Sequence, residues 1–287
     1  MRYRPLGNSG PALSALTLRL GDATRPSADD TRALLLAAAA CGITSVQIDG
    51  ASDDLLRGAR EAFARIERRQ LFVTLRARGA PEAMLASTLD ALGLEAADLL
   101  LINDPQGPAP PAALENALRA RRAAGQGCGL GVAARGEIDP RLLDHDLVVA
   151  IVSPFDLTSG LAERQRLREA DRRGLLVFGE DFWPQTLRDG ARTLPRPSLW
   201  RRRTDPLAGI GGYDFLSDTP GWTSEEICLA YALTEPTLTS VCVSAEHPDD
   251  LRRLVAVVDR ALPDSVRAQI ELARFSAQER DKAAGRA

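Results

Sequence analysis

Short apolar runs rich in β-forming residues alternate with longer segments of helical period along nearly the whole chain. The predicted strands are Leu16–Leu20, Thr44–Ile48, Leu71–Leu75, Asp98–Asn103, Cys128–Ala133, Leu147–Ser153, Leu175–Gly179 and Thr239–Val243. The predicted helices include Ala28–Cys41, Asp53–Glu67, Pro81–Leu92, Pro111–Ala124, Leu161–Arg173, Thr223–Thr234 and Pro248–Ala261. Eight strand–helix units predict an α/β fold, a closed (β/α)8 TIM barrel with its helices outside. A doubly wound open sheet is the alternative, but no GxGxxG motif follows an early strand.

Four segments fall outside this repeat, and all of them belong to one domain over residues 1–287. Residues 1–12, which contain the turn sequence Gly7-Asn8-Ser9-Gly10, predict a small hairpin that caps one end of the barrel. Residues 188–221 are rich in Arg, Pro and Gly and predict a long loop or lid after the seventh strand. Asp264–Ser276 predicts one more helix, and residues 277–287 a frayed tail.

The composition is that of an ordinary folded protein, with 287 residues, 45% hydrophobic residues and a formal net charge of -3. This near-neutral charge argues against a nucleic-acid partner, which usually needs a basic face. Charged residues break every apolar run well before the about 20 residues of a membrane span, so no membrane association is expected. The first residues have no apolar core followed by a cleavage site, and the expected location is the cytoplasm.

The residue types narrow the chemistry further. Of the 36 Lys and Arg residues, Lys282 in the tail is the only lysine, which is typical of a GC-rich bacterial genome. Arginine keeps its proton near neutral pH, so lysine chemistry is excluded from the body of the protein. The four cysteines lie in apolar surroundings without CxxC pairing, which predicts buried, inert thiols and no metal site.

Several segments together resemble the aldo-keto reductase family. The opening Met1–Gly10, followed by Leu13-Ser14-Ala15-Leu16, is similar to the start of these enzymes. The similarity continues through Gly42-Ile43-Thr44, residues 53–59, Ala97–Ile102, Gly131-Val132 and Thr239–Leu254, and so covers most of the chain. The resemblance implies a TIM barrel that binds NADP(H) and reduces carbonyl groups with an Asp, a Tyr, a Lys and a His at the barrel mouth.

The chain departs from the family at all four catalytic positions. The positions that match the family's Asp, Tyr, Lys and His are Gln47, Ser52, Leu75 and Asn103. Another alignment does not restore the tetrad, because Tyr213 on the long loop is the only tyrosine expected to reach the mouth. The resemblance is therefore to a divergent member that has lost the proton relay.

The positions that hold the cofactor in the family are changed as well. Ala133, Ala134 and Val152 stand where the family binds the carboxamide, and their side chains form no hydrogen bonds. Phe178 matches the aromatic platform beneath the nicotinamide. Glu180 and Asp181 fall beside the pyrophosphate, which they would repel. We therefore expect no cofactor, with NADPH as the alternative.

The carboxyl ends of the barrel strands supply the candidate site residues, because sites in this fold form there. Asp49, Glu180 and Asp181 are the acids expected to converge, and crowded carboxylates serve as general acid and base. Asn103 completes the catalytic candidates as a group that polarises a carbonyl. Arg19 either clamps an anionic ligand or forms salt bridges that plug the mouth. The full set of ligand-binding candidates is Arg19, Gln47, Ser52, Arg76, Phe178, Trp183 and Tyr213.

Three functions remain open at this point. The favoured one is a repurposed non-redox enzyme, an acid/base lyase, dehydratase, isomerase or cyclase that acts on a small polar metabolite in a biosynthetic pathway. The alternative is a pseudoenzyme that binds a ligand or a protein partner, and this predicts a mouth plugged by Arg19. The third is an atypical NADPH-dependent oxidoreductase.

Overall fold

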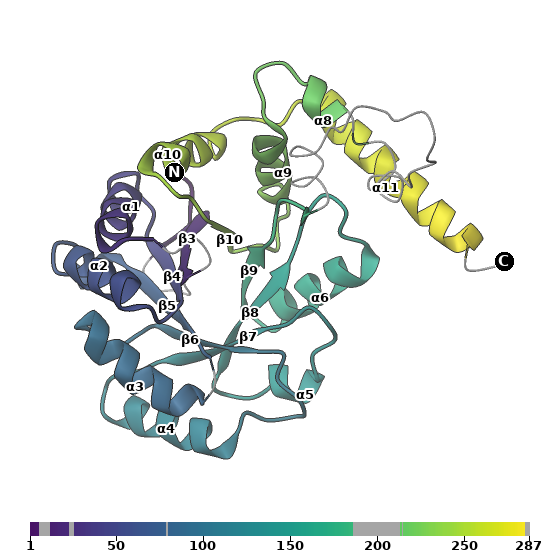
Figure 1. The fold of residues 1–287 in the computed structure, drawn as a ribbon. Coiled ribbons are helices and arrows are strands. Elements are labelled where there is room, and N and C mark those ends of the chain that lie inside the picture. Colours follow the sequence, from purple (N-terminus) through teal and green to yellow (C-terminus); the bar gives the residue numbers. More distant parts are fainter. Residues whose placement is uncertain (6–11, 23–25, 79, 186–212, 214, 285–287) are drawn as a thin grey trace, which may run out of the picture.

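Eight parallel strands close into a barrel, which confirms the predicted TIM-barrel fold (Figure 1). The computed structural model describes residues 1–5, 12–22, 26–78, 80–185, 213 and 215–284. The barrel strands are β3 (Leu16–Gly21), β4 (Ser45–Asp49), β5 (Phe72–Arg76), β6 (Leu99–Asn103), β7 (Gly129–Ala133), β8 (Val148–Pro154), β9 (Leu176–Glu180) and β10 (Ser240–Val243). They pair in chain order, and β10 closes the ring by pairing with both β9 and β3.

Helices surround the barrel, and those predicted from the sequence begin within one residue of their predicted starts. They are α1 (Ala28–Ala40), α2 (Asp53–Phe63), α3 (Pro81–Leu92), α4 (Ala112–Ala123), α5 (Pro140–Leu143), α6 (Leu161–Arg172), α8 (Phe215–Asp218), α9 (Ser224–Ala232), α10 (Pro248–Val257) and α11 (Asp264–Ala284), with the 3-10 turn η2 (Arg68–Gln70) before β5. None of the described helices combines the length and the apolar character that crossing a bilayer requires.

Two predictions about the segments outside the repeat need correction. Helix α11 continues to Ala284, past the predicted end at Ser276, so most of the predicted frayed tail is helical. The predicted loop over residues 188–221 contains the short helix α8, while residues 186–212 and 214 lie outside the described part of the chain. Figure 1 shows α8 and α11 together at the outer side of the barrel.

The predicted hairpin closes the end of the barrel where the strands begin. Strand β1 (Tyr3–Pro5) pairs antiparallel with β2 (Ala12–Ser14), and the turn sequence Gly7–Gly10 lies outside the described residues. Leu13 is completely buried and packs among side chains from inside the barrel. The hydroxyl of Ser14 donates a hydrogen bond to the carbonyl oxygen of Leu16, which ties the hairpin to β3.

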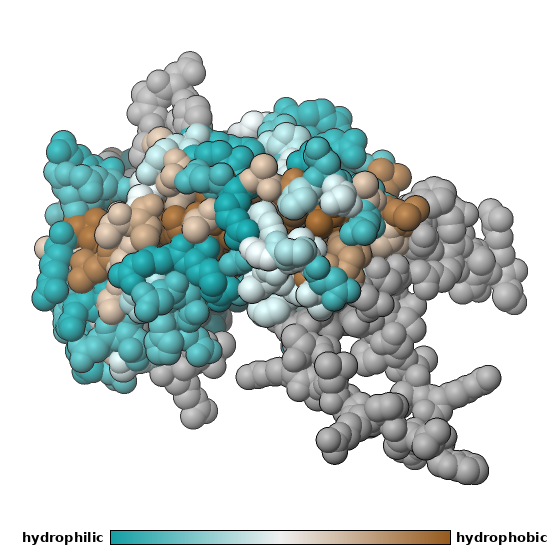
Figure 2. All heavy atoms as spheres, turned by 90° about the horizontal axis from the view of Figure 1, so that it is seen from above, coloured by the Kyte–Doolittle hydropathy of each residue, from teal (hydrophilic) through white to brown (hydrophobic). Residues whose placement is uncertain are grey.

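Side chains of each barrel strand alternate between two cores. On β3, Leu16, Leu18 and Leu20 belong to the core between barrel and helices, whereas Thr17 and Arg19 lie between them in sequence and face inward. The inner core contains Phe72, Leu99, Leu101, Ala133, Ala150, Val152, Phe178 and Cys242. Figure 2 shows one outer side of the molecule, where hydrophilic residues flank a band of apolar ones, as on ordinary protein surfaces.

Candidate functional site

Four charged side chains meet inside the barrel where the strands end. Arg19 of β3 donates from Nε to Oδ2 of Asp49 on β4 at 3.0 Å. Arg76 of β5 donates from Nη1 to Oε2 of Glu180 on β9 at 2.7 Å. Longer ion pairs, of 3.7 Å between Arg19 and Glu180 and of 3.9 Å between Arg76 and Asp49, close the group. We call Arg19, Asp49, Arg76 and Glu180 the mouth network.

The mouth network is stable at this depth because its charges compensate one another. The side chains of Asp49 and Glu180 are only 9% and 5% exposed, and a buried charge without a partner would be costly. Burial alone would lower the pKa of the Arg76 guanidinium, but the hydrogen bond and charge of Glu180, together with Asp49, raise that pKa above its ordinary value. Arg76 therefore stays charged beside both carboxylates.

A third arginine and an amide complete the hydrogen bonds around the network. Arg78 donates from Nη2 to the backbone oxygen of Asp49 at 2.8 Å and to its Oδ1 at 3.1 Å. Asn103 accepts a hydrogen bond from Nε of Arg76 at 2.7 Å and donates one to the carbonyl oxygen of Ala77 at 2.9 Å. Asn103 thus braces the network through its amide oxygen and one of its two amide N–H groups.

Of the three acids predicted to converge, Asp181 does not join the other two. Its backbone adopts a φ of 55°, in the left-handed region, and its carboxylate pairs with Arg135 at 2.5 Å. This pair lies at the rim, where Arg135 is 72% exposed. Trp183, two residues further on, is half-buried and packs against the main core.

The layer beneath the network is polar but closed. Gln47 is 1% exposed, and its Nε2 has no hydrogen-bond partner among the described residues. The Cys242 thiol lies 3.9 Å from Oε1 of Gln47. Burial, with the nearby charge of Glu180, raises the pKa of Cys242 to about 12, so this thiol is not a nucleophile at neutral pH.

The positions aligned with the family's lysine and tyrosine both lie away from the network. Leu75 is 1% exposed and packs outward against the helices, and the inward residue of β5 is its neighbour Arg76. Ser52 is exposed at the start of α2, where its backbone nitrogen donates to Asp22 at 3.2 Å. A cation and a carboxylate therefore do meet at the mouth, but Arg76 cannot exchange its proton and no tyrosine hydroxyl stands beside it.

Tyr213, the tyrosine expected to reach over the mouth, is buried elsewhere. It is 3% exposed, packs against Phe215 and donates a long hydrogen bond of 3.5 Å to the carbonyl oxygen of Leu157. Burial raises the pKa of its hydroxyl well above the ordinary value. This position removes Tyr213 from the candidate ligand-binding residues.

The residues at the mouth do not fit NADPH. Phe178, the predicted nicotinamide platform, is 2% exposed and stacks on Phe72 inside the barrel with ring centroids 6.2 Å apart. Ala133 and Val152 are buried in the same inner core and carry no polar group. Glu180, which the resemblance places beside the pyrophosphate, is buried and paired with Arg76.

The chain matches no protein-family model and no curated protein. Within the described part of the chain, no group of three or more His, Cys, Asp or Glu side chains is arranged to hold a metal ion.

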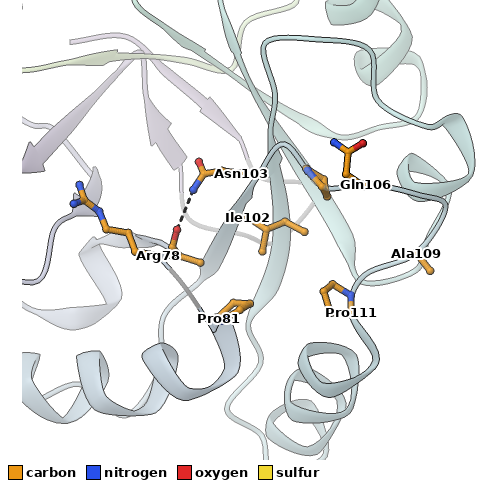
Figure 3. A pocket seen from close by; sticks show the side chains of 9 residues that line it. Arg78, Pro81, Ile102, Asn103, Gln106, Ala109 and Pro111 are labelled. Carbon is orange, nitrogen blue, oxygen red and sulfur yellow. Dashed lines mark hydrogen bonds between the residues drawn. The ribbon is translucent and has the colours of Figure 1, made fainter.

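A cavity of about 460 Å³ lies beside the mouth, between the loops that follow β5 and β6 (Figure 3). Its lining consists of Ala77, Arg78, Pro81, Ile102, Asn103, Pro105, Gln106, Ala109 and Pro111, and we call it the side cleft. Figure 3 shows Pro81 and Pro111 at the starts of two helices, and Arg78 with its guanidinium turned away from the cleft. The side cleft was not predicted from the sequence, although Pro81 after β5 and the four prolines over residues 105–111 after β6 were a usable signal.

Asp156, just after β8, was also not among the predicted site residues. It is half-buried, and burial raises the pKa of its carboxyl group above the ordinary value. Its Oδ1 accepts hydrogen bonds from the backbone nitrogen and the hydroxyl of Thr158, both at 2.6 Å. A carboxyl group in this state is suited to carrying a proton near the rim.

Proposed function

We propose that this chain is a redox-inactive pseudoenzyme of the aldo-keto reductase type that binds a small molecule beside its closed mouth. The observation that carries the proposal is the mouth network. Both of its carboxylates are paired with arginines, as the pseudoenzyme hypothesis predicted for Arg19. A general base must be free to approach the proton that it removes, and arginine N–H groups hold both oxygens of Asp49 in hydrogen bonds.

The network also argues against carbonyl reduction. Hydride transfer to a carbonyl needs a proton donor beside it, and the described groups of the mouth network and its surroundings are arginines, the carboxylates paired with them and the Asn103 amide. Phe178 and Glu180, which the resemblance places beside the nicotinamide and the pyrophosphate, are both buried and so are not open to a cofactor. We therefore propose that no nicotinamide cofactor takes part in the function.

The side cleft supports a ligand-binding role. Its volume of about 460 Å³ lies within the range of small-molecule sites, and its proline-rich walls are already rigid. Its one charged lining residue, Arg78, turns its guanidinium away from the cleft and donates a hydrogen bond to Asp49. The ligand class that suits these walls is an uncharged small molecule with an apolar body and a few hydrogen-bonding groups, for which Gln106 is an available partner.

The test is a titration of the purified protein with NADPH and with NADP+, followed by tryptophan fluorescence and thermal shift together. We expect no saturable change up to millimolar cofactor, and no carbonyl-dependent oxidation of NADPH. Saturable binding at micromolar cofactor would overturn the proposal and support the oxidoreductase.

A repurposed acid/base enzyme is the second candidate, favoured by the inward position of Asp49 and Glu180 and by the raised pKa of Asp156. It requires a substrate that opens the network. Turnover of any screened metabolite that is lost in Asp156→Asn or Glu180→Gln, with the fold intact, would favour this enzyme over the pseudoenzyme.

A further inference from the structure

A second cavity, of about 170 Å³, lies at the opposite end of the barrel from the mouth. It is lined by Arg2, Tyr3, Arg4, Ala15, Leu233, Glu235, Leu238, Thr239, Ser240 and Val241, and we call it the base cavity. Arg2 and Arg4 flank Tyr3 at the start of the hairpin, where side chains alternate between two faces. Two guanidinium groups are therefore brought to one face of the hairpin, and both line the base cavity.

No carboxylate among the described residues forms an ion pair with Arg2 or Arg4. Arg4 donates from Nη1 to the carbonyl oxygen of Pro236 at 2.7 Å, which uses one of its five N–H donors. Within the described part of the chain, Arg2 forms no side-chain hydrogen bond or ion pair. Burial and the charge of Arg2 lower the pKa of Arg4, and the opposing effect of the charges of Asp171 and Glu235 is smaller.

Glu235 does not neutralise the pair, although it lines the same cavity. Its Oε2 pairs with Arg164 at 2.8 Å, and its Oε1 accepts from the hydroxyl of Thr237 at 2.9 Å. Several arginines elsewhere are matched with carboxylates, for example Arg19 with Asp49 and Arg119 with Asp146. Arg4 is half-buried and Arg2 is exposed, and because the two neighbouring cations repel each other, an anion that bridges them would be bound favourably.

We propose that the base cavity binds a phosphate group, either free phosphate or the phosphoryl group of a monoester. Guanidinium forks match phosphate oxygens in geometry and charge. The volume suits a group of this size and leaves little room for a bulky ligand. Thr239 accepts a hydrogen bond from the Val177 nitrogen at 3.0 Å and keeps its hydroxyl proton for a further acceptor such as a phosphate oxygen. This site is separate from the mouth and from the side cleft and does not depend on their function.

The experiment compares sodium phosphate, glycerol phosphate and sodium chloride at equal ionic strength, by thermal shift and by isothermal titration calorimetry. The proteins are the wild type, Arg2→Gln, the double variant Arg2→Gln/Arg4→Gln, and the control Arg57→Gln/Arg69→Gln. The control removes the same charge from exposed arginines elsewhere, which pair with Asp54 and Glu67. Arg2→Gln keeps the proposal testable should the loss of the Arg4 bond to Pro236 weaken the fold.

We expect a phosphate to stabilise the wild type and the control beyond the effect of chloride. Arg2→Gln should weaken the affinity several-fold, and the double variant about tenfold or more, because each arginine supplies charge-assisted hydrogen bonds. Tighter binding of glycerol phosphate than of free phosphate would identify a monoester as the ligand, and the reverse would identify the free ion. An equal response to chloride, or an equal phosphate affinity in Arg2→Gln and the control, would overturn the proposal.

Discussion

Arg76 and Glu180 meet across the inside of the barrel at 2.7 Å, although their strands, β5 and β9, are not neighbours in the sheet. Strand pairing therefore does not bring these two residues together. Their ion pair spans the space that a substrate would enter in a functional TIM barrel, and it is only slightly exposed. The ion pair thus links opposite walls of the mouth, and its contribution to stability can be measured.

Replacing Arg76 by methionine should destabilise the protein strongly. The substitution leaves Glu180 buried with Arg19 at 3.7 Å as its remaining partner. Breaking a buried ion pair on one side typically costs about 3 kcal/mol or more, and we expect a loss of this size in the free energy of unfolding from urea denaturation. The control Arg57→Met removes an exposed partner of Asp54 and should cost less than about 1 kcal/mol. Equal stabilities of the two variants would contradict a bracing role.

The fold could be predicted from the sequence because the strand pattern recurs eight times and a helical period follows most of the strands. Helix α3 has the predicted bounds Pro81–Leu92, with a proline at its start and Gly93 in the left-handed region at its end. The one-turn helices α5 and α8 were missed because so few residues carry no periodic signal. The extension of α11 was missed because the charged residues after Ser276 show no apolar stripe.

Two features of the sequence predicted site residues: the position of the strand ends, and the alternation of inward and outward side chains along each strand. Asp49 and Glu180 converge as expected, since both stand at the ends of barrel strands. Phe178 is two residues before Glu180 and must share its inward face, so the alternation already places it one layer deeper. Leu75 shows the opposite case, because a shift of one residue along β5 exchanges an outward leucine for the inward Arg76. The left-handed backbone of Asp181 has no signal in the sequence.

Native thiol reactivity should be confined to Cys41. Cys128, Cys228 and Cys242 are buried, whereas Cys41 at the end of α1 is partly exposed. Burial raises the pKa of Cys128 and of Cys242 to about 12, so their thiolate forms are rare at pH values near 8. Labelling with Ellman's reagent should release about one equivalent from the native protein and four after denaturation, the full cysteine content. Loss of the native signal in Cys41→Ser is the expected control, and rapid labelling of Cys242 would show that the inner layer opens.

Filling the side cleft should abolish binding of small neutral molecules. Ala109 is exposed and lines the cleft, so Ala109→Trp places a large ring there without disturbing the core. Saturation-transfer NMR with indole as the probe should give a signal for the wild type that is lost in Ala109→Trp. The matched control is Ala123→Trp, at the exposed far end of α4, which should retain it. Loss of the signal in both variants, or in neither, would argue against ligand binding in the cleft.

Asp156→Asn should change the pH dependence of stability with a definite sign. Burial raises the pKa of Asp156 in the folded protein, so the folded state holds this proton to a higher pH than the unfolded chain does. Below the unfolded value of about 3.9 both states are protonated and nothing is lost. As the pH rises through the folded pKa, ionisation costs folding free energy, and the cost is fully present at neutral pH. Asparagine carries no such cost.

The amide oxygen of asparagine can still accept the hydrogen bonds that Thr158 donates to Asp156. Asp156→Asn should therefore be more stable than the wild type at neutral pH, and the difference should vanish at about pH 3, in urea titrations at the two pH values. Asp139→Asn provides a comparison of opposite sign, because hydrogen bonds from Arg141 lower the pKa of Asp139. Its removal should cost stability at neutral pH and nothing at low pH. A loss of stability in Asp156→Asn at neutral pH would mean that the ionised carboxylate is favoured at this rim, and an acid role there would be excluded.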